Sequence, residues 1–365
     1  MQLHQVISEA VDNVAAMDRS RKALAERLLP LQKHNLLELK SAELLEKSLI
    51  SPVEKAGLDC KIAGVDSGFI GKDLLALDLI LIRSVGVVFS YERNRVAKAD
   101  YYPSIYSFPE PHLSSGSLEF DEFQCNKSIQ RLLQEVSTAK ALIEKFSPKF
   151  CFLDGSMVPQ YADKPRKDSR IKSAYHKMLE EFQSLYETAA KANCELIACV
   201  EDSRGSRFRQ ILQEHLLAGQ KGLSGQLDNC YDAVLLDYLL KPGQRSLSFT
   251  YTSSIKEHPI LMDFDEGWAR AVHAFYIKPV AFDRPLRVEF LHPNGESIEE
   301  HASSIASTVF AQSCMHREYA YPAILIEADF NARLKPQEIE IVYDKILNKL
   351  GKGFKLRLRR DNRPF

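Results

Sequence analysis

Hydrophobic residues recur at intervals of three and four over the first 55 residues of the chain, which are rich in Leu, Glu, Lys and Ala. Leucines such as Leu24, Leu28 and Leu31 would lie along one face of a helix. This spacing predicts two or three amphipathic helices in residues 1–55. We expect this helical region to pack against a second copy of the chain or against a partner.

The hydrophobic pattern changes to that of β-strands near residue 61. The short apolar run at residues 61–66 predicts a strand that ends at Asp66. The apolar run at residues 74–91 is long enough for two strands, with a break around Arg83. The stretch that follows, residues 101–121, is rich in proline and serine and predicts a loop or flap.

Predicted helices and strands then alternate along the chain. Residues 128–146 carry one apolar face at helical spacing and lead into a strand that ends at Asp154. Residues 171–192 predict a helix, and residues 195–201 predict an apolar strand. Such alternation is typical of the α/β class. Further helices are predicted at residues 207–217, 298–315 and 336–350, and further strands at residues 247–253, 287–291 and 323–327.

The size and composition of the chain indicate a soluble protein with one large core. The chain has 365 residues, of which 45% are hydrophobic, and its apolar runs are shorter than a membrane span. It contains no internal repeat and no clear linker. We therefore expect one mixed-sheet core domain at residues 56–365, preceded by the helical region at residues 1–55.

Cysteine usage and charge limit the compartment and the mode of binding. The seven cysteines are scattered without a C-x-x-C pair, and the first residues lack the layout of a secretory signal. This combination predicts a reducing cytoplasm and no zinc site. The formal net charge is −1, so attraction to nucleic acid must come from local basic clusters. One candidate is the tail at residues 352–363, where basic and apolar residues alternate as in an edge strand.

Three acidic residues are candidates for a metal site. Asp66 and Asp154 each end a predicted strand and are followed by small residues, which keep the approach to a carboxylate open. Glu135 falls at the edge of the apolar stripe of its predicted helix. Three carboxylates suit Mg²⁺ or Mn²⁺, and two such ions can cleave a phosphodiester. Helix capping and simple solvation account for the same residues equally well on this pattern.

Two arginines are candidates for contact with DNA. Arg204 and Arg207 lie near a predicted helix start at Ser206. Guanidinium groups and the free backbone N–H donors of a helix start both bind phosphate. The alternative is that both arginines are solvated surface residues.

The order of the motifs along the chain resembles that of the NurA nuclease family, whose core is similar to ribonuclease H. No single motif is specific, but together they cover most of the chain from about residue 60 onward. The matching segments are Gly64-Val65-Asp66-Ser67-Gly68, the helix that carries Glu135, Leu153-Asp154-Gly155-Ser156, Glu201-Asp202-Ser203-Arg204, residues 241–246, Arg287-Val288-Glu289 and Tyr321-Pro322.

The resemblance implies a set of active-site residues. It assigns metal binding and catalysis to Asp66, Glu135 and Asp154, and it places a further active-site tyrosine at Tyr321. The family usually has a histidine where this chain has Asp329. An aspartate can bind a metal or orient water, but it cannot donate a proton near neutral pH as an imidazolium does.

The resemblance also implies an activity and its partners. It predicts a deoxyribonuclease dependent on Mn²⁺ or Mg²⁺ that cuts single-stranded DNA internally and digests single- and double-stranded DNA from 5′ to 3′. The enzyme would be a cytoplasmic homodimer. It would act beside a hexameric HerA-type translocase in DNA end resection during double-strand break repair.

Two other classes of function remain open at this level. Actin-like ATPases and sugar kinases share the ribonuclease H-like topology, and their phosphate loops contain an Asp-x-Gly like Asp66-Ser67-Gly68. The chain has no Gly-rich adenosine-binding segment to support that alternative. A non-catalytic DNA-binding scaffold subunit is the third possibility. Two departures from the family keep it open, namely Asp329 in place of the histidine and Glu201 in place of a lysine that the family tends to have. The presence of all three acids, Asp66, Glu135 and Asp154, argues against it.

Overall fold

The computed structural model describes residues 2–30, 35–116, 118–228, 230–292, 297–351 and 356. Within it the chain forms two compact units, each assembled from three separate stretches of sequence. Unit 1 consists of Met1–Gly57, Cys199–Ser253 and Arg270–Pro322, and unit 2 consists of Leu58–Ala198, Ser254–Ala269 and Ala323–Phe365. The predicted division into a helical region at residues 1–55 and a core domain at residues 56–365 stays a prediction.

Unit 2 is built on a mixed β-sheet with the strand order β7-β6-β2-β3-β4, and β5 also pairs with β3. Strands β2 and β6 run parallel, whereas β3 runs antiparallel to β2, β4 and β5. The predicted α/β class with a mixed sheet is confirmed. The strands are β2 (Lys61–Asp73), β3 (Leu77–Glu92), β4 (Arg95–Tyr102), β5 (Glu110–Ser115), β6 (Phe150–Asp154) and β7 (Glu195–Val200).

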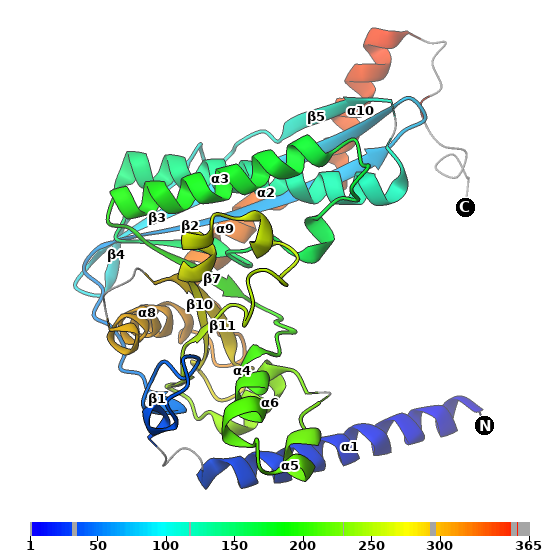
Figure 1. The fold of residues 1–365 in the computed structure, drawn as a ribbon. Helices are drawn as coiled ribbons and strands as arrows, with labels where there is room; N and C mark the ends of the chain where they lie inside the picture. The colour runs from blue at the N-terminus through cyan, green and yellow to red at the C-terminus, as the bar shows by residue number, and fades with distance from the viewer. Residues whose placement is uncertain are drawn as a thin grey trace. The chain divides into compact units, whose positions relative to one another are not determined.

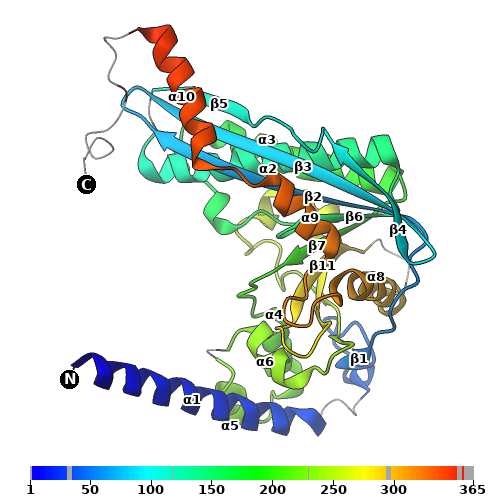
Figure 2. The same cartoon turned by 180° about the vertical axis from the view of Figure 1, so that it is seen from behind.

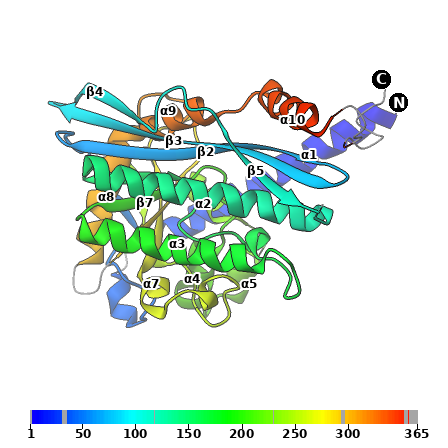
Figure 3. The ribbon, with the colours of Figure 1, turned by 90° about the horizontal axis from the view of Figure 1, so that it is seen from above.

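Helices cover both faces of this sheet. Figure 3 shows α2 and α3 on one side of β2 and β3, with α9 and α10 on the other side. Glycines allow this close approach, because a Cβ at Gly86 would lie 2.3 Å from Leu142 of α2, and one at Gly64 would lie 2.7 Å from Ile324 of α9. The helices of unit 2 are α2 (Phe120–Phe146), α3 (Lys172–Lys191), α9 (Ala323–Ala332) and α10 (Pro336–Leu350), with short 3₁₀ turns η3 (Tyr161–Asp163) and η5 (Leu261–Asp263) and the start of α7 (Glu266–Ala271).

A long hairpin replaces the three short strands predicted between residues 61 and 91. β2 continues through Asp66 to Asp73, and β3 is unbroken at Arg83. The two strands pair continuously from Lys61 opposite Ser90 to Asp73 opposite Asp78. The predicted strand end at Asp66 is therefore wrong, because pairing with β3 keeps the polar and glycine-rich second half of β2 extended.

Two other predicted elements differ from the structure. The expected flap at residues 101–121 contains β5 and the first residues of α2, so it is only partly a loop. The expected strand at residues 323–327 is the first half of α9. Its apolar residues are packed on β2, and a short apolar run does not distinguish a buried helix from a strand.

Unit 1 contains a small antiparallel sheet and several helices. Its strands follow the order β1-β8-β10-β11, and β9 also pairs with β10. The strands are β1 (Ile50–Pro52), β8 (Gln244–Ser246), β9 (Phe249–Thr250), β10 (Val272–Lys278) and β11 (Leu286–Leu291). The helices are α1 (Gln2–Leu28), α4 (Arg207–Ile211), α5 (Lys221–Gly225), α6 (Asp232–Leu239) and α8 (Ile298–Ser313), with the 3₁₀ turn η2 (Leu36–Leu39) and the π-helical turn η4 (Leu212–Leu216).

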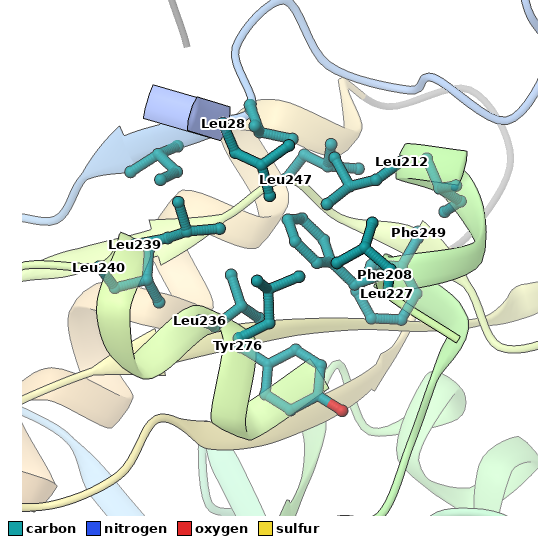
Figure 4. Close-up of a cluster of buried hydrophobic side chains, with 14 of the residues drawn as sticks. Leu28, Phe208, Leu212, Leu227, Leu236, Leu239, Leu240, Leu247, Phe249 and Tyr276 are labelled. Carbon is teal, nitrogen blue, oxygen red and sulfur yellow. The ribbon is translucent and has the colours of Figure 1, made fainter. Parts of the chain in front are cut away.

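The core of unit 1 joins the end of α1 to later parts of the sequence. Figure 4 shows Leu28 among side chains of α6 and of the sheet, including Leu236 and Tyr276. The described part of the predicted helical region contains one long helix and η2, rather than two or three amphipathic helices. Toward its N-terminus, α1 extends away from α6 (Figures 1 and 2). The large apolar side chains of this part of the helix, from Leu3 to Met17, are exposed.

A buried ion pair fixes the N-terminal region to the sheet of unit 1. Glu46 and Arg245 are fully buried, and both carboxylate oxygens of Glu46 lie 2.9 Å from Nη1 of Arg245. The Ser248 N–H also donates to Glu46, at 2.8 Å. Because a buried charge is costly unless paired, loss of either partner would destabilise this unit strongly.

No helix in the described ranges is both long and apolar enough to cross a bilayer. The predicted basic edge strand at residues 352–363 lies outside the described residues, apart from Leu356. That residue is buried, and its carbonyl accepts a hydrogen bond from the N–H of Leu75 at 3.0 Å.

Replacement of Gly68 tests the packing of α9 on β2. A Cβ at this position would lie 2.4 Å from the backbone carbonyl oxygen of Ala332, so the helix would have to shift. We expect Gly68→Ala to lower the free energy of unfolding by about 1–3 kcal/mol, the typical cost of overpacking. Gly219→Ala is the matched control, since nothing lies within 4 Å of its added Cβ. Equal melting temperatures for the two variants, measured by circular dichroism, would contradict the close packing.

Candidate active site

Asp66 lies in the middle of β2, on the face that α9 covers. Side chains alternate along a strand, so Asp66 shares a face with Gly64 and Gly68, both of which are in close contact with α9. The carboxylate is buried, and its Oδ1 lies 2.6 Å from the N–H of Ser67. The two glycines therefore leave room for an acid beneath a helix.

Asp154 lies beside Asp66 because β2 and β6 are parallel and in register. Val65 is opposite Leu153, and Asp154 is the last residue of β6. The side chains of Asp66 and Asp154 are hydrogen-bonded to each other. The structure thus brings these two candidate acids together, although Asp66 does not end its strand.

Glu135 reaches the same strand from the other face. It projects from α2, is buried, and accepts a hydrogen bond from the Ser67 hydroxyl. Nη1 of Arg131, one helical turn earlier, lies 2.7 Å from Oε2 of Glu135 and 3.3 Å from the Ser67 hydroxyl. Ser67 and Arg131 were not predicted from the sequence. The spacing of four residues between Arg131 and Glu135 was the available indication of their ion pair.

The three acids carry an excess of buried negative charge. Burial, together with the nearby carboxylates of Asp154 and Glu135, raises the pKa of Asp66 to about 8. Burial also raises the pKa of Glu135 to about 7, against the opposing effect of Arg131 and Ser67. Acids whose pKa is raised in this way are frequent at functional sites. Arg131 offsets one of the three negative charges, and a divalent cation would neutralise the other two.

An open pocket of about 760 Å³ brings three of the predicted residues together. Asp66, Asp154 and Asp329 line it, as do Ser67 and Arg131, which contact Glu135. Asp329 projects from α9 and forms an ion pair with Arg333 of the same helix. Asp329 reaches the pocket because residues 323–332 form α9 and not the predicted strand at 323–327.

The carboxylates of Asp66, Glu135 and Asp154 do not all lie within 4.8 Å of one another. Among the described residues, the only set of three potential ligands with atoms all within 4.8 Å of one another is Glu43, Glu214 and His215. In that set, His215 lies 2.8 Å from Glu43, and the buried Arg207 also pairs with Glu43. Arg207 therefore already supplies a positive charge to this group. The carboxylate of Glu135 is instead engaged by Ser67 and Arg131.

The predicted residues of unit 1 have different surroundings. Tyr321 is buried, and its hydroxyl donates to the carbonyl oxygen of Cys199 at 3.0 Å. Arg204 is exposed, whereas Arg207 is buried against Glu43. A buried guanidinium with a carboxylate partner does not fit the expected contact with DNA.

The start of α4 is also unavailable to phosphate. The N–H groups of Phe208 and Arg209 donate to the carboxylate of Asp232, at 3.0 and 2.9 Å. The expectation of free donors at this helix start is therefore wrong. The carboxylate of Asp232 thus caps the first turn of α4.

The Asp-x-Gly segment does not form the turn of a nucleotide-binding loop. Asp66, Ser67 and Gly68 are opposite Val85, Ser84 and Arg83 in the continuous pairing of β2 with β3. The hydroxyl of Ser67 donates a hydrogen bond to Glu135. This geometry gives no support to the kinase-like alternative.

A family model matches most of the chain. The family model described as the NurA domain matches residues 60–334. None of the curated proteins matches the chain. A NurA nuclease structure from Sulfolobus solfataricus has 14% sequence identity and a TM-score of 0.57, over 97% of this chain and 99% of that chain. Another NurA structure has 10% identity and a TM-score of 0.51, over 96% and 98% of the two chains. A NurA structure bound to dAMP and manganese has 10% identity and a TM-score of 0.48, over 96% of each chain.

The raised pKa values predict how pH affects the protein without metal. In the unfolded chain these acids ionise near pH 4, whereas in the folded chain Asp66 and Glu135 keep their protons up to about pH 7–8. The folded state binds more protons in this window, so we expect stability to fall as pH rises from about 4 to 8. Thermal melts in EDTA across this range measure the effect.

Asp66→Asn should flatten this pH dependence and raise the melting temperature above pH 8, because it removes one of the repelling charges. Glu92→Gln is the control, since Glu92 is an exposed acid of the same unit. Parallel melting curves for the parent and Asp66→Asn would show that the acids do not repel each other in the folded protein.

Proposed function

The chain belongs to the NurA family, and we propose that it is a metal-dependent deoxyribonuclease. The family resemblance predicted from the motifs is confirmed by the match over residues 60–334. The observation that carries the proposal is the contact between Asp66 and Asp154 in an open pocket, with Glu135 directly behind Ser67. All three acids lie inside the matched region.

The donor set fits a hard divalent cation. Asp66 and Asp154 offer carboxylate oxygens at the pocket, and Mn²⁺ or Mg²⁺ prefers such ligands. Glu135 would be the third ligand, once its carboxylate is released from Ser67 and Arg131. When bound, the cation would lower the pKa of a water and neutralise charge that develops on the leaving oxygen of a phosphodiester.

The protein's own groups would orient the substrate around this centre. Arg131 is close to Glu135 and also lines the pocket, so its guanidinium is placed to contact a phosphate oxygen. Asp329 is at the same pocket and would orient water, with Arg333 holding its carboxylate. Tyr321 remains a proposed active-site residue on the strength of the family resemblance, and Arg204, which is exposed, a proposed DNA contact.

The finer activity is likewise proposed from the resemblance. The enzyme would cut single-stranded DNA internally and digest single- and double-stranded DNA from 5′ to 3′. It would work in the cytoplasm beside a HerA-type hexameric ATPase during end resection in double-strand break repair. The acidic pocket supports phosphodiester hydrolysis and does not by itself define the polarity or the partner.

A homodimer is proposed from the resemblance and from the surface of α1. Leu3, Ile7, Val14 and Met17 follow one another at helical spacings of four, seven and three residues along this helix, and all are exposed. Such a stripe is typical of a helix that packs against another helix. The end of the same helix, at Leu24 and Leu28, is buried in unit 1.

Digestion of end-labelled DNA tests the proposed activity. We expect the protein to cut single-stranded DNA with Mn²⁺ or Mg²⁺ and not with EDTA. Asp66→Ala should lower the rate by more than about 100-fold, since groups that merely orient metal ligands already contribute 10- to 100-fold. Glu92→Ala should cut like the parent. DNA binding without cutting, under every metal condition, would favour the scaffold alternative instead.

Charge placed in the stripe of α1 tests the dimer. Val14→Glu should convert the dimer to a monomer, because it introduces a charge among exposed apolar side chains that would be buried between copies. Ser8→Glu adds the same charge outside the stripe and should leave the dimer intact. Light scattering after gel filtration measures both masses. A monomeric parent protein would refute the proposal.

A further inference from the structure

The edge of β2 is open beyond the two aspartates. β6 ends at Asp154, and its pairing with β2 ends with Leu153 opposite Val65. β2 itself continues to Asp73, while the chain after Asp154 turns away through Gly155, which has a φ of +97°. The pocket therefore extends along the part of β2 that follows Asp66.

Phe69 lines this pocket although it is a large apolar side chain. It is 42% exposed, and it shares the pocket with Asp66 and Asp154. Of the large apolar side chains that are exposed among the described residues, Phe69 is the one that lines this pocket. A cation also lies beside the same ring.

The cation is Lys127 of α2. Its Nζ lies 5.8 Å from the centroid of the Phe69 ring and 5.1 Å from that of Phe123. Gly71 leaves space for this lysine, because a Cβ at that position would lie 2.6 Å from the lysine Cδ. The lysine is thus held beside the aromatic ring by close packing.

The spacing of these groups suits a single strand of nucleic acid. Three residues along a strand separate Asp66 from Phe69, which corresponds to about 10 Å between their Cα atoms. Their side chains leave opposite faces of β2, and both line the pocket at the open edge of the strand. A phosphate at the carboxylates would then have a neighbouring base within reach of the ring. Aromatic side chains beside basic groups are the general means by which proteins bind unpaired strands without sequence preference.

We propose that Phe69 is a stacking platform for an unpaired base next to the scissile phosphate, and that Lys127 contacts the DNA backbone at that base. This inference rests on the proposed nuclease function and names the form of DNA that the pocket takes. A paired base has its faces covered by its neighbours in the duplex. The platform therefore selects single strands and frayed ends, and a duplex must unpair before it is cut.

The chain offers a matched control at Phe108. This residue is also an exposed phenylalanine of unit 2, and Nζ of Lys345 lies 6.0 Å from its ring centroid. It does not line the pocket that holds Asp66 and Asp154. A general loss of exposed aromatic surface would affect both sites, whereas loss of the platform would affect Phe69 alone.

The test uses an oligonucleotide that carries 2-aminopurine, whose fluorescence is quenched when the base stacks. Binding is measured in the full-length Asp66→Asn protein, so that the DNA is not cut. Phe69→Ala should weaken binding about 10- to 100-fold, as expected for the loss of one base–aromatic stack, and it should abolish the quenching. Phe69→Tyr and Phe108→Ala should retain both. Cleavage by the corresponding variants with an intact Asp66 should show a raised KM for single-stranded DNA.

Several results would overturn the inference. Phe69→Leu is included because it keeps the apolar volume without the ring, and normal quenching with this variant would mean packing rather than stacking. Unchanged KM and quenching in Phe69→Ala, in a chain that cuts DNA, would remove the platform and leave the nuclease proposal standing. Failure of the parent protein to cut or bind any DNA would instead remove the proposed function, and the inference with it.

Discussion

The parallel pairing of β2 with β6 brings two carboxylates of like charge into contact. Leu153 is opposite Val65, so Asp154 is level with Asp66. In such a buried site the ionised forms repel each other, and the protonated forms are favoured without a cation. The sheet gains nothing in stability from this arrangement. Acids whose pKa is raised in this way are frequent at functional sites, and this agrees with the proposed metal centre.

The two faces of β2 then divide the supporting roles. On one face, Gly64 and Gly68 permit α9 to pack directly on the strand, and this brings Asp329 to the pocket. On the other face, Ser67 and Arg131 hold Glu135. One extended strand therefore positions all the acidic groups, and its continuation beyond β6 provides the open edge. The length of the hairpin is as important to the site as its charged residues.

Helices and strands with a clear hydrophobic periodicity were predictable from the sequence. Features that depend on contacts between residues far apart in the sequence were not. Pro336 at the start of α10 and Gly351 after its end marked that helix, and the apolar face that includes Ile143 marked α2. Asp66 and Asp154 were recognisable from the apolar runs that precede them, whereas their contact depends on the parallel pairing of β2 with β6. The second half of β2 has no apolar pattern of its own. Likewise, the burial of Arg207 depends on Glu43, which lies 164 residues away in sequence.

The division of each unit into three stretches has a consequence for synthesis. Glu46 lies near the beginning of the chain, yet its buried partner Arg245 belongs to a stretch made much later. On the ribosome, an N-terminal segment with an unpaired acid and exposed leucines must wait for most of the protein to emerge. Contacts between such remote segments form slowly. The nascent chain thus has a long interval in which its apolar helix is open to chaperones or to a neighbouring copy.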